Sequence, residues 1–235
     1  LTRHFGTHDL AGFGVTDTML AVGPAGALLE YVRSTQGGIL PALDGLRVEH
    51  PSQYIELDAA TRRNLELTET IRGEATPTLF SLLDHCATGM GSRLLAHWLH
   101  HPLRSQPRIL ERQTAIATLI ESGCYQTITS VLENVADIER ITARIALRSA
   151  RPRDLSSLRD SLAQLPQLAG VLPQSEFFSN MAQLLQPDPA LFALLSAAIL
   201  PEPSLVLREG GVIADGFSPE LDELRAIQKN CGEFL

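Results

Sequence analysis

Residues 105–123, SQPRILERQTAIATLIESG, carry a long helical pattern with a clear start and a clear end. Ser105 can cap the first turn, and apolar side chains then recur at helical spacing. The apolar side of this pattern consists of Ile109, Ile116 and Ile120. Gly123 follows the last turn, as a glycine after a helix C-terminus does. The sequence therefore predicts a helix of about four to five turns here.

The same pattern recurs on both sides of this segment, with short connections that contain glycine or proline. The helices predicted in this way cover approximately residues 25–34, 58–63, 78–86, 91–101, 125–134, 137–149, 153–165, 175–186, 189–200 and 218 onward. Successive helices with short connections are typical of a helical bundle. We therefore expect a mainly α fold, a multi-helix bundle-like core domain with a small β element and a short α/β segment before it.

Two stretches favour extended structure. In residues 53–57, Ile55 and Leu57 alternate with their neighbours, which predicts a half-buried strand. Residues 204–214 contain Gly210-Gly211 between apolar pairs and predict a small strand or hairpin. Before these, glycines are frequent in residues 1–48, and Gly37-Gly38 is expected to end the first long helix.

Composition narrows the class of protein. Hydrophobic residues make up 44% of the 235 residues and aromatic residues 5%, so the core should consist mainly of Leu, Ile, Val and Ala. A net charge of −8 argues against a free-standing nucleic-acid binder. The three cysteines lie far apart, which favours reduced thiols in the cytoplasm. No apolar run reaches the roughly 18 residues of a membrane span, so no membrane partner is expected. Both ends are expected to be cut from a longer chain, because neither has the usual terminal features.

Three histidines gather near the end of one predicted helix: His97, His100 and His101. Histidines four residues apart can share a metal ion. The favoured interpretation is a solvated or partner-facing helix side, because no acidic ligand lies on that helix. The opposite side of the helix, with Leu94, Leu95, Trp98 and Leu99, is expected to be buried. No metal site, catalytic residue or cofactor-binding residue is therefore expected.

A second cluster is basic. The arginines that form it are Arg140, Arg144 and Arg148, continued by Arg151 and Arg153. Spacing of four residues predicts one basic stripe, with Ile138, Ile141 and Ile145 buried opposite. Like charges at this spacing are unfavourable, so an anion should lie nearby. That anion is either a phosphate, or carboxylates such as Asp137 and Asp154 and those of neighbouring domains. Eleven acidic against six basic residues in 151–235 favour ion pairing to acidic residues of neighbouring helices or of the missing domains.

Four stretches, in order along the chain, resemble the bacterial MutS family of DNA mismatch-repair proteins. They are residues 57–67 (LDAATRRNLEL); 78–84 (TLFSLLD) with 90–95 (MGSRLL) and 98–103 (WLHHPL); 137–141 (DIERI) with 150–155 (ARPRDL); and 209–213 (EGGVI) with 216–217 (GF) and 220–225 (ELDELR). Residues 5–48 resemble the end of that family's connector domain more weakly. The resemblance implies a connector remnant over 1–48 and the first part of the core (lever) domain over 49–235, ending before the DNA clamp.

The resemblance also implies partners and cofactors for a longer parent protein. These are mismatched double-stranded DNA, other MutS domains, a second MutS subunit and MutL, with ATP and Mg²⁺ in the ATPase domain and a bacterial cytoplasmic, nucleoid-associated location. The chain itself contains no Gly-x-x-x-x-Gly-Lys-Ser/Thr phosphate loop, because its one lysine, Lys229, precedes Asn230. None of its eight Phe residues has Glu two positions later, as the family's mismatch reader does.

Three functions follow as hypotheses. The chain is a structural core that couples the ATPase and DNA-binding domains of its parent, which is the favoured one. It is alternatively an interaction module that docks repair partners through residues 1–48. The third hypothesis is an independent helical metalloenzyme that uses His97, His100 and His101.

Overall fold

The computed structural model describes residues 1–15, 19–35, 43, 45–46, 48, 53–205 and 207–233. It is mainly helical, which confirms the predicted fold class. Its residues group into two compact units. Unit 1 contains Leu1–Ala117 and Thr142–Ser149, and unit 2 contains Thr118–Ile141 and Ala150–Leu235. The expected domain boundary after residue 48 stays a prediction, and residues 49–52 lie outside the described part of the chain.

Unit 1 is built from short helices. They are α1 (Thr2–Phe5), η1 (Ala11–Phe13), α2 (Val22–Thr35), α3 (Ala59–Asn64), α4 (Leu79–Leu83), α5 (Gly89–His100) and α6 (Gln106–Ser122), which continues into unit 2. Helix α6 has the predicted bounds, and Gly123 follows it with a positive φ of 68°. The predicted end of α2 at Gly37-Gly38 lies outside the described residues.

Polar side chains fix the starts of these helices. The Asp58 carboxylate accepts a hydrogen bond of 2.6 Å from the Thr61 amide, as expected for the cap of α3. Thr78 and Ser81 form a reciprocal capping box at the start of α4, with bonds of 3.1 and 2.8 Å. The Thr88 hydroxyl accepts from the Gly91 amide at the start of α5. These caps satisfy amides that the helices themselves leave unpaired.

The strand predicted over residues 53–57 was wrong in extent. A single antiparallel bridge pairs Tyr54 with Leu103. The Ile55 amide donates to the Pro102 carbonyl at 2.8 Å, and the Arg104 amide donates to the Gln53 carbonyl at 3.1 Å. Pairing stops there, and Ile55 is 50% exposed. The alternation of apolar residues therefore does not report a buried face, because the partner segment between α5 and α6 is too short for a ladder.

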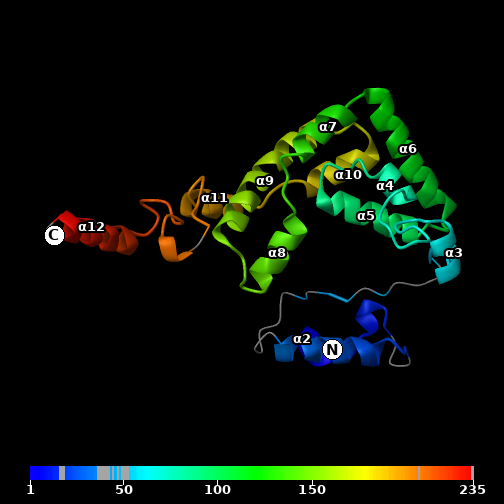
Figure 1. Ribbon diagram of the computed structural model, residues 1–235, viewed down its shortest axis with the longest axis horizontal. Helices are drawn as coiled ribbons and strands as arrows, with labels where there is room; N and C mark the ends of the chain where they lie inside the picture. Colours follow the sequence, from blue (N-terminus) through cyan, green and yellow to red (C-terminus); the bar gives the residue numbers. More distant parts are fainter. Residues whose placement is uncertain are drawn as a thin grey trace. The chain divides into compact units, whose positions relative to one another are not determined.

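Unit 2 is organised around one long helix, α9 (Pro152–Val171). Its other helices are α7 (Tyr125–Leu132), the start of α8 (Ile138–Ala146), α10 (Glu176–Leu184), α11 (Pro189–Ala198), η3 (Leu207–Glu209) and α12 (Pro219–Glu233). Helices α7, α10 and α11 make their main helix–helix contacts with α9 (Figure 1). The start predicted for α12, with Ser218 before Pro219, is confirmed, since the Ser218 hydroxyl accepts from the Leu221 amide at 3.4 Å.

Helix α9 extends beyond its predicted end at residue 165, because it continues through Pro166 to Val171. A proline inside a helix removes one backbone hydrogen bond and costs about 3 kcal/mol. Burial on the far side of the proline offsets that cost, since Leu168 and Leu172 are both buried. Packing thus outweighs local propensity at this position.

The core of unit 2 is aliphatic, as the composition predicted. It consists of Ile141, Leu158, Leu162, Leu195, Ala198, Ile199 and Val212. The small β element expected within residues 204–214 is instead a bridge between Ile199 and Ile213, flanked by the helical turn η3. The Leu200 amide donates to the Val212 carbonyl at 3.0 Å. The predicted hairpin was therefore wrong, because the pairing partner of Ile213 follows α11 and does not lie within the same segment.

Among the described residues, no helix combines the length and apolar character needed to cross a membrane.

Candidate functional site

The five candidate arginines do not form one continuous stripe. Arg140 and Arg144 lie four residues apart on α8 and share one face of that helix. Arg148 lies after the end of α8, Arg151 caps the start of α9, and Arg153 lies in the first turn of α9. Arg140 forms an ion pair with Asp137 at 3.4 Å, as expected. The Asp154 carboxylate accepts from the backbone amide of Arg151 at 2.9 Å and completes the start of α9.

Arg148 departs from the predicted pattern. Helix α8 ends at Ala146, three residues before its predicted end, and Arg148 has a positive φ of 53°. The Ser149 amide turns back to the Arg144 carbonyl at 2.9 Å. The predicted stripe was therefore wrong at Arg148, since this residue lies in the turn after the helix. Ile145 was also wrongly placed, because it is 38% exposed, whereas Ile141 is buried as predicted.

The histidines of α5 do not form a solvated helix side. His97 and His101 stack with ring centroids 4.3 Å apart, and the Tyr54 ring meets the His101 ring edge-on at 5.5 Å. His100 bonds through Nε2 to the Thr68 hydroxyl at 2.9 Å. All three histidines are partly buried within unit 1. The predicted solvated face was therefore wrong, because the 53–54 and 66–74 segments pack on it.

The apolar side of α5 is correspondingly more open than predicted. Leu94 is 49% exposed and Trp98 is 38% exposed. The Arg112 guanidinium of α6 lies 3.8 Å from the centre of the Trp98 ring, which is close enough for a cation–π contact. In the described part of the chain, no three His, Cys, Asp or Glu side chains form a group that could hold a metal ion.

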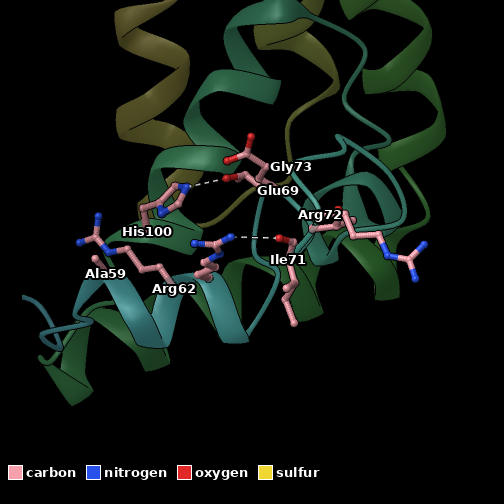
Figure 2. Close-up of a pocket in the computed structure, with 10 residues that line it drawn as sticks. Ala59, Arg62, Glu69, Ile71, Arg72, Gly73 and His100 are labelled. Atoms are coloured by element: carbon pink, nitrogen blue, oxygen red, sulfur yellow. Dashed lines mark hydrogen bonds between the residues drawn. The ribbon is translucent and has the colours of Figure 1, made fainter.

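A cavity of about 520 Å³ lies between α3, the loop 68–73 and His100. Figure 2 shows Arg62 and His100 on the same side of this pocket, whereas the Arg72 side chain projects away from both. Arg62 donates through Nε to the Leu57 carbonyl at 3.0 Å. Arg63 donates to the Ile71 carbonyl at 3.1 Å across the pocket. Each of the two adjacent arginines of α3 thus makes one hydrogen bond to a backbone carbonyl beside the pocket.

Backbone hydrogen bonds hold the loop beside the pocket at its base and at its tip. The amides of Leu79 and Phe80 donate to the Glu66 and Leu67 carbonyls, so the first turn of α4 holds the base of the loop. At its tip, the Gly73 amide donates to the Thr70 carbonyl at 2.9 Å. Gly73 has a φ of 83°, which favours glycine.

His100 has an unusual environment. Its Nδ1 atom is buried and has no hydrogen-bond partner within the described structure. Burial lowers the pKa of His100, and the nearby charges of Arg62, His101 and His97 lower it further. Both effects favour the neutral form of the His100 imidazole. No pattern in the sequence connects His100 with α3, although Arg62 and Arg63 stand together in the last turn of the helix that Asp58 caps.

The described structure is that of a helical domain with an aliphatic core. Residues 60–234 match the family model of MutS domain III. The match covers more than half of the chain, which therefore belongs to the MutS family. This membership identifies a MutS-type mismatch-repair protein and a domain of a non-catalytic type. It also implies DNA and other MutS domains or subunits as partners.

Proposed function

We propose that this chain forms the structural core of a MutS-type protein and couples the ATPase domain of that protein to its DNA-binding domains. The observation that carries the proposal is the match to MutS domain III over residues 60–234. Unit 2 supports it physically, because helices packed on one central helix can transmit displacement as a rigid body. Connector residues 1–48 and core residues 49–235 remain the proposed division.

ATP and Mg²⁺ are assigned to another domain of the parent protein. The residues present do not fit these ligands, since the sequence has no glycine-rich loop that precedes a lysine. Mismatched DNA and a second MutS subunit are likewise proposed as partners of the parent. A cytoplasmic, nucleoid-associated location is part of the same proposal.

The coupling is tested by replacing domain III of a complete MutS protein with residues 60–234. The chimera should hydrolyse ATP faster when mismatched DNA is added. Arg159 of α9 donates to the carbonyls of Ile199 and Leu200, which follow α11. Arg159→Gln removes these charged hydrogen bonds within unit 2, and should reduce this stimulation and leave the rate without DNA unchanged. The exposed Arg208→Gln serves as the charge-matched control. Equal stimulation in both variants, with Arg159→Gln destabilised, would contradict a coupling role.

Docking of a repair partner such as MutL through residues 1–48 is the second proposal. Its supporting observation is the exposure of apolar side chains there: Leu20 is 95% exposed, and Leu28 and Tyr31 are each 64% exposed. Leu28→Ser with Tyr31→Ser should abolish capture of MutL by the chain, whereas Leu224→Ser in α12 should not. Undiminished capture by the double variant would rule out this surface.

A further inference from the structure

The end of the pocket at α3 presents two positive charges, those of Arg62 and Arg63. Each guanidinium carries five N–H donors, and the structure gives one of them to a backbone carbonyl in Arg62 and one in Arg63. Within the described residues, no carboxylate forms an ion pair with either arginine. Donors of both side chains therefore remain available to a ligand in the cavity.

The walls of the pocket are preorganised. The Ile71 amide donates to the Glu66 carboxylate at 2.8 Å, and the Thr70 amide donates to the Glu74 carbonyl at 2.8 Å. The Thr68 hydroxyl is joined to His100. Together with the bond from Arg63 to the Ile71 carbonyl, these bonds connect α3, the loop and α5 before any ligand arrives, so little ordering is needed on binding.

We propose that Arg62, Arg63 and the Thr68–His100 pair bind the phosphate group of a small molecule. Two guanidiniums supply a charge of +2, which equals the charge of a phosphate monoester above its second ionisation. A carboxylate is satisfied by a single arginine through two parallel bonds, so a pair of arginines exceeds its requirement. Glu69 and Arg72, which also line the cavity, have opposite charges.

The size and charge of the surroundings favour a small ligand over duplex DNA. The volume of about 520 Å³ lies within the range of small-molecule sites, roughly 300–1,000 Å³. A duplex requires an extended basic face, and the chain has a net charge of −8. A duplex would therefore gain few further contacts beyond this pocket.

His100 provides a signal that is specific to the site. Burial and the nearby charge of Arg62 lower its pKa in the empty pocket and favour the neutral ring. A bound dianion offsets the charge of Arg62 and favours the imidazolium form. The pKa of His100 should therefore rise when phosphate binds, and its ring resonances should report the change.

The test uses the 235-residue chain with pyrophosphate, inorganic phosphate and a short DNA duplex as separate probes. Binding is followed by calorimetry and by NMR of the histidine rings. Pyrophosphate should bind saturably and raise the pKa of His100. Arg62→Gln should weaken this binding about tenfold, since it removes a charged hydrogen-bond donor. Arg72→Gln, which makes the same change of charge in a side chain directed away from His100, should weaken it less than about twofold.

Each outcome decides the proposal. Saturable binding that Arg62→Gln weakens and Arg72→Gln does not supports it. No saturable effect of pyrophosphate on His100 in the unaltered chain overturns it, whatever the stability of the variants. Equal losses in both variants indicate general electrostatic attraction and overturn it as well. Arginine-dependent binding of the duplex alone would replace the small ligand with a DNA-backbone contact.

Discussion

The Arg159 guanidinium lies 3.0 Å from the carbonyl oxygen of Ile199, forty residues further along the chain. It also donates to the carbonyls of Leu200 and Pro201, at 3.2 and 3.3 Å, and to the Asp160 carboxylate. Carbonyls after the end of a helix lack intrahelical donors. Arg159 thus joins α9 to the segment that follows α11.

Replacement of Arg159 by Leu should lower the free energy of unfolding by about 2–3 kcal/mol. The Leu side chain keeps some of the apolar stem and removes the charged donors, and a hydrogen bond to a charged group contributes about 1.5–3 kcal/mol. Urea denaturation followed by circular dichroism would measure the change. Arg208→Leu, at an exposed position, should stay within about 0.5 kcal/mol of the unaltered chain. A similar effect of both substitutions would show that the three carbonyls do not depend on Arg159.

Like Arg159, Ser161 of α9 joins segments that are distant in sequence, here α9 and the residue Ala136 before α8. Its side chain is fully buried; the hydroxyl donates to the Ser157 carbonyl and accepts from the Ala136 amide at 2.9 Å. Ser161→Ala would leave that amide without its acceptor and should destabilise the chain by about 1–3 kcal/mol. Thermal unfolding would measure the effect against Ser179→Ala on the exposed side of α10. Unchanged stability in Ser161→Ala would mean that the Ala136 amide finds another acceptor.

The hydrogen bond by which Asp58 caps α3 predicts that helix content decreases in acid. Hydrogen bonds from Thr61 hold the pKa of Asp58 below its ordinary value of 3.8. Because the folded-state pKa is the lower one, the stabilisation is complete above the unfolded value and is lost as the pH falls through the folded value. Helical signal should therefore decrease more between pH 4 and pH 2 in the unaltered chain than in Asp58→Asn, which caps without titrating. Identical acid profiles of the two chains would show that protonation of Asp58 does not cause the loss of helix.

Ion pairing of the candidate arginines predicts that the affinity of the chain for DNA depends only weakly on salt concentration. If they form ion pairs within and between domains, few phosphates are neutralised, and the affinity of the chain for duplex DNA should change little with salt. Fluorescence anisotropy at several salt concentrations would give the slope. A steep slope that Arg151→Gln with Arg153→Gln reduces by about two would instead identify phosphate contacts.

Local chemistry made the helix starts predictable. Asp58, Ser105 and Pro219 each stand where a helix was expected to begin, because capping depends on a few neighbouring residues. The family resemblance likewise predicted a MutS core domain, and residues 60–234 match it. The roles of the arginines stay predictions.

The errors have a common physical origin in contacts between segments distant in sequence. The helix predicted to end at residue 165 continues through Pro166, because the burial of Leu168 outweighs the local cost of the proline. Ile213 pairs with Ile199 through a contact that no local pattern specifies. The pocket beside α3 was missed for the same reason, since Arg62 and His100 are brought together only by the folded loop.

The packing of α7, α10 and α11 on α9 has a consequence for the order in which unit 2 opens. An outer helix can detach while the others keep their contact with α9, whereas exposure of α9 requires loss of several interfaces at once. Backbone amides of α9 should therefore exchange with deuterium most slowly, near the rate set by global unfolding. Those of α10, whose Leu184 is 85% exposed, should exchange through smaller fluctuations and at an earlier time.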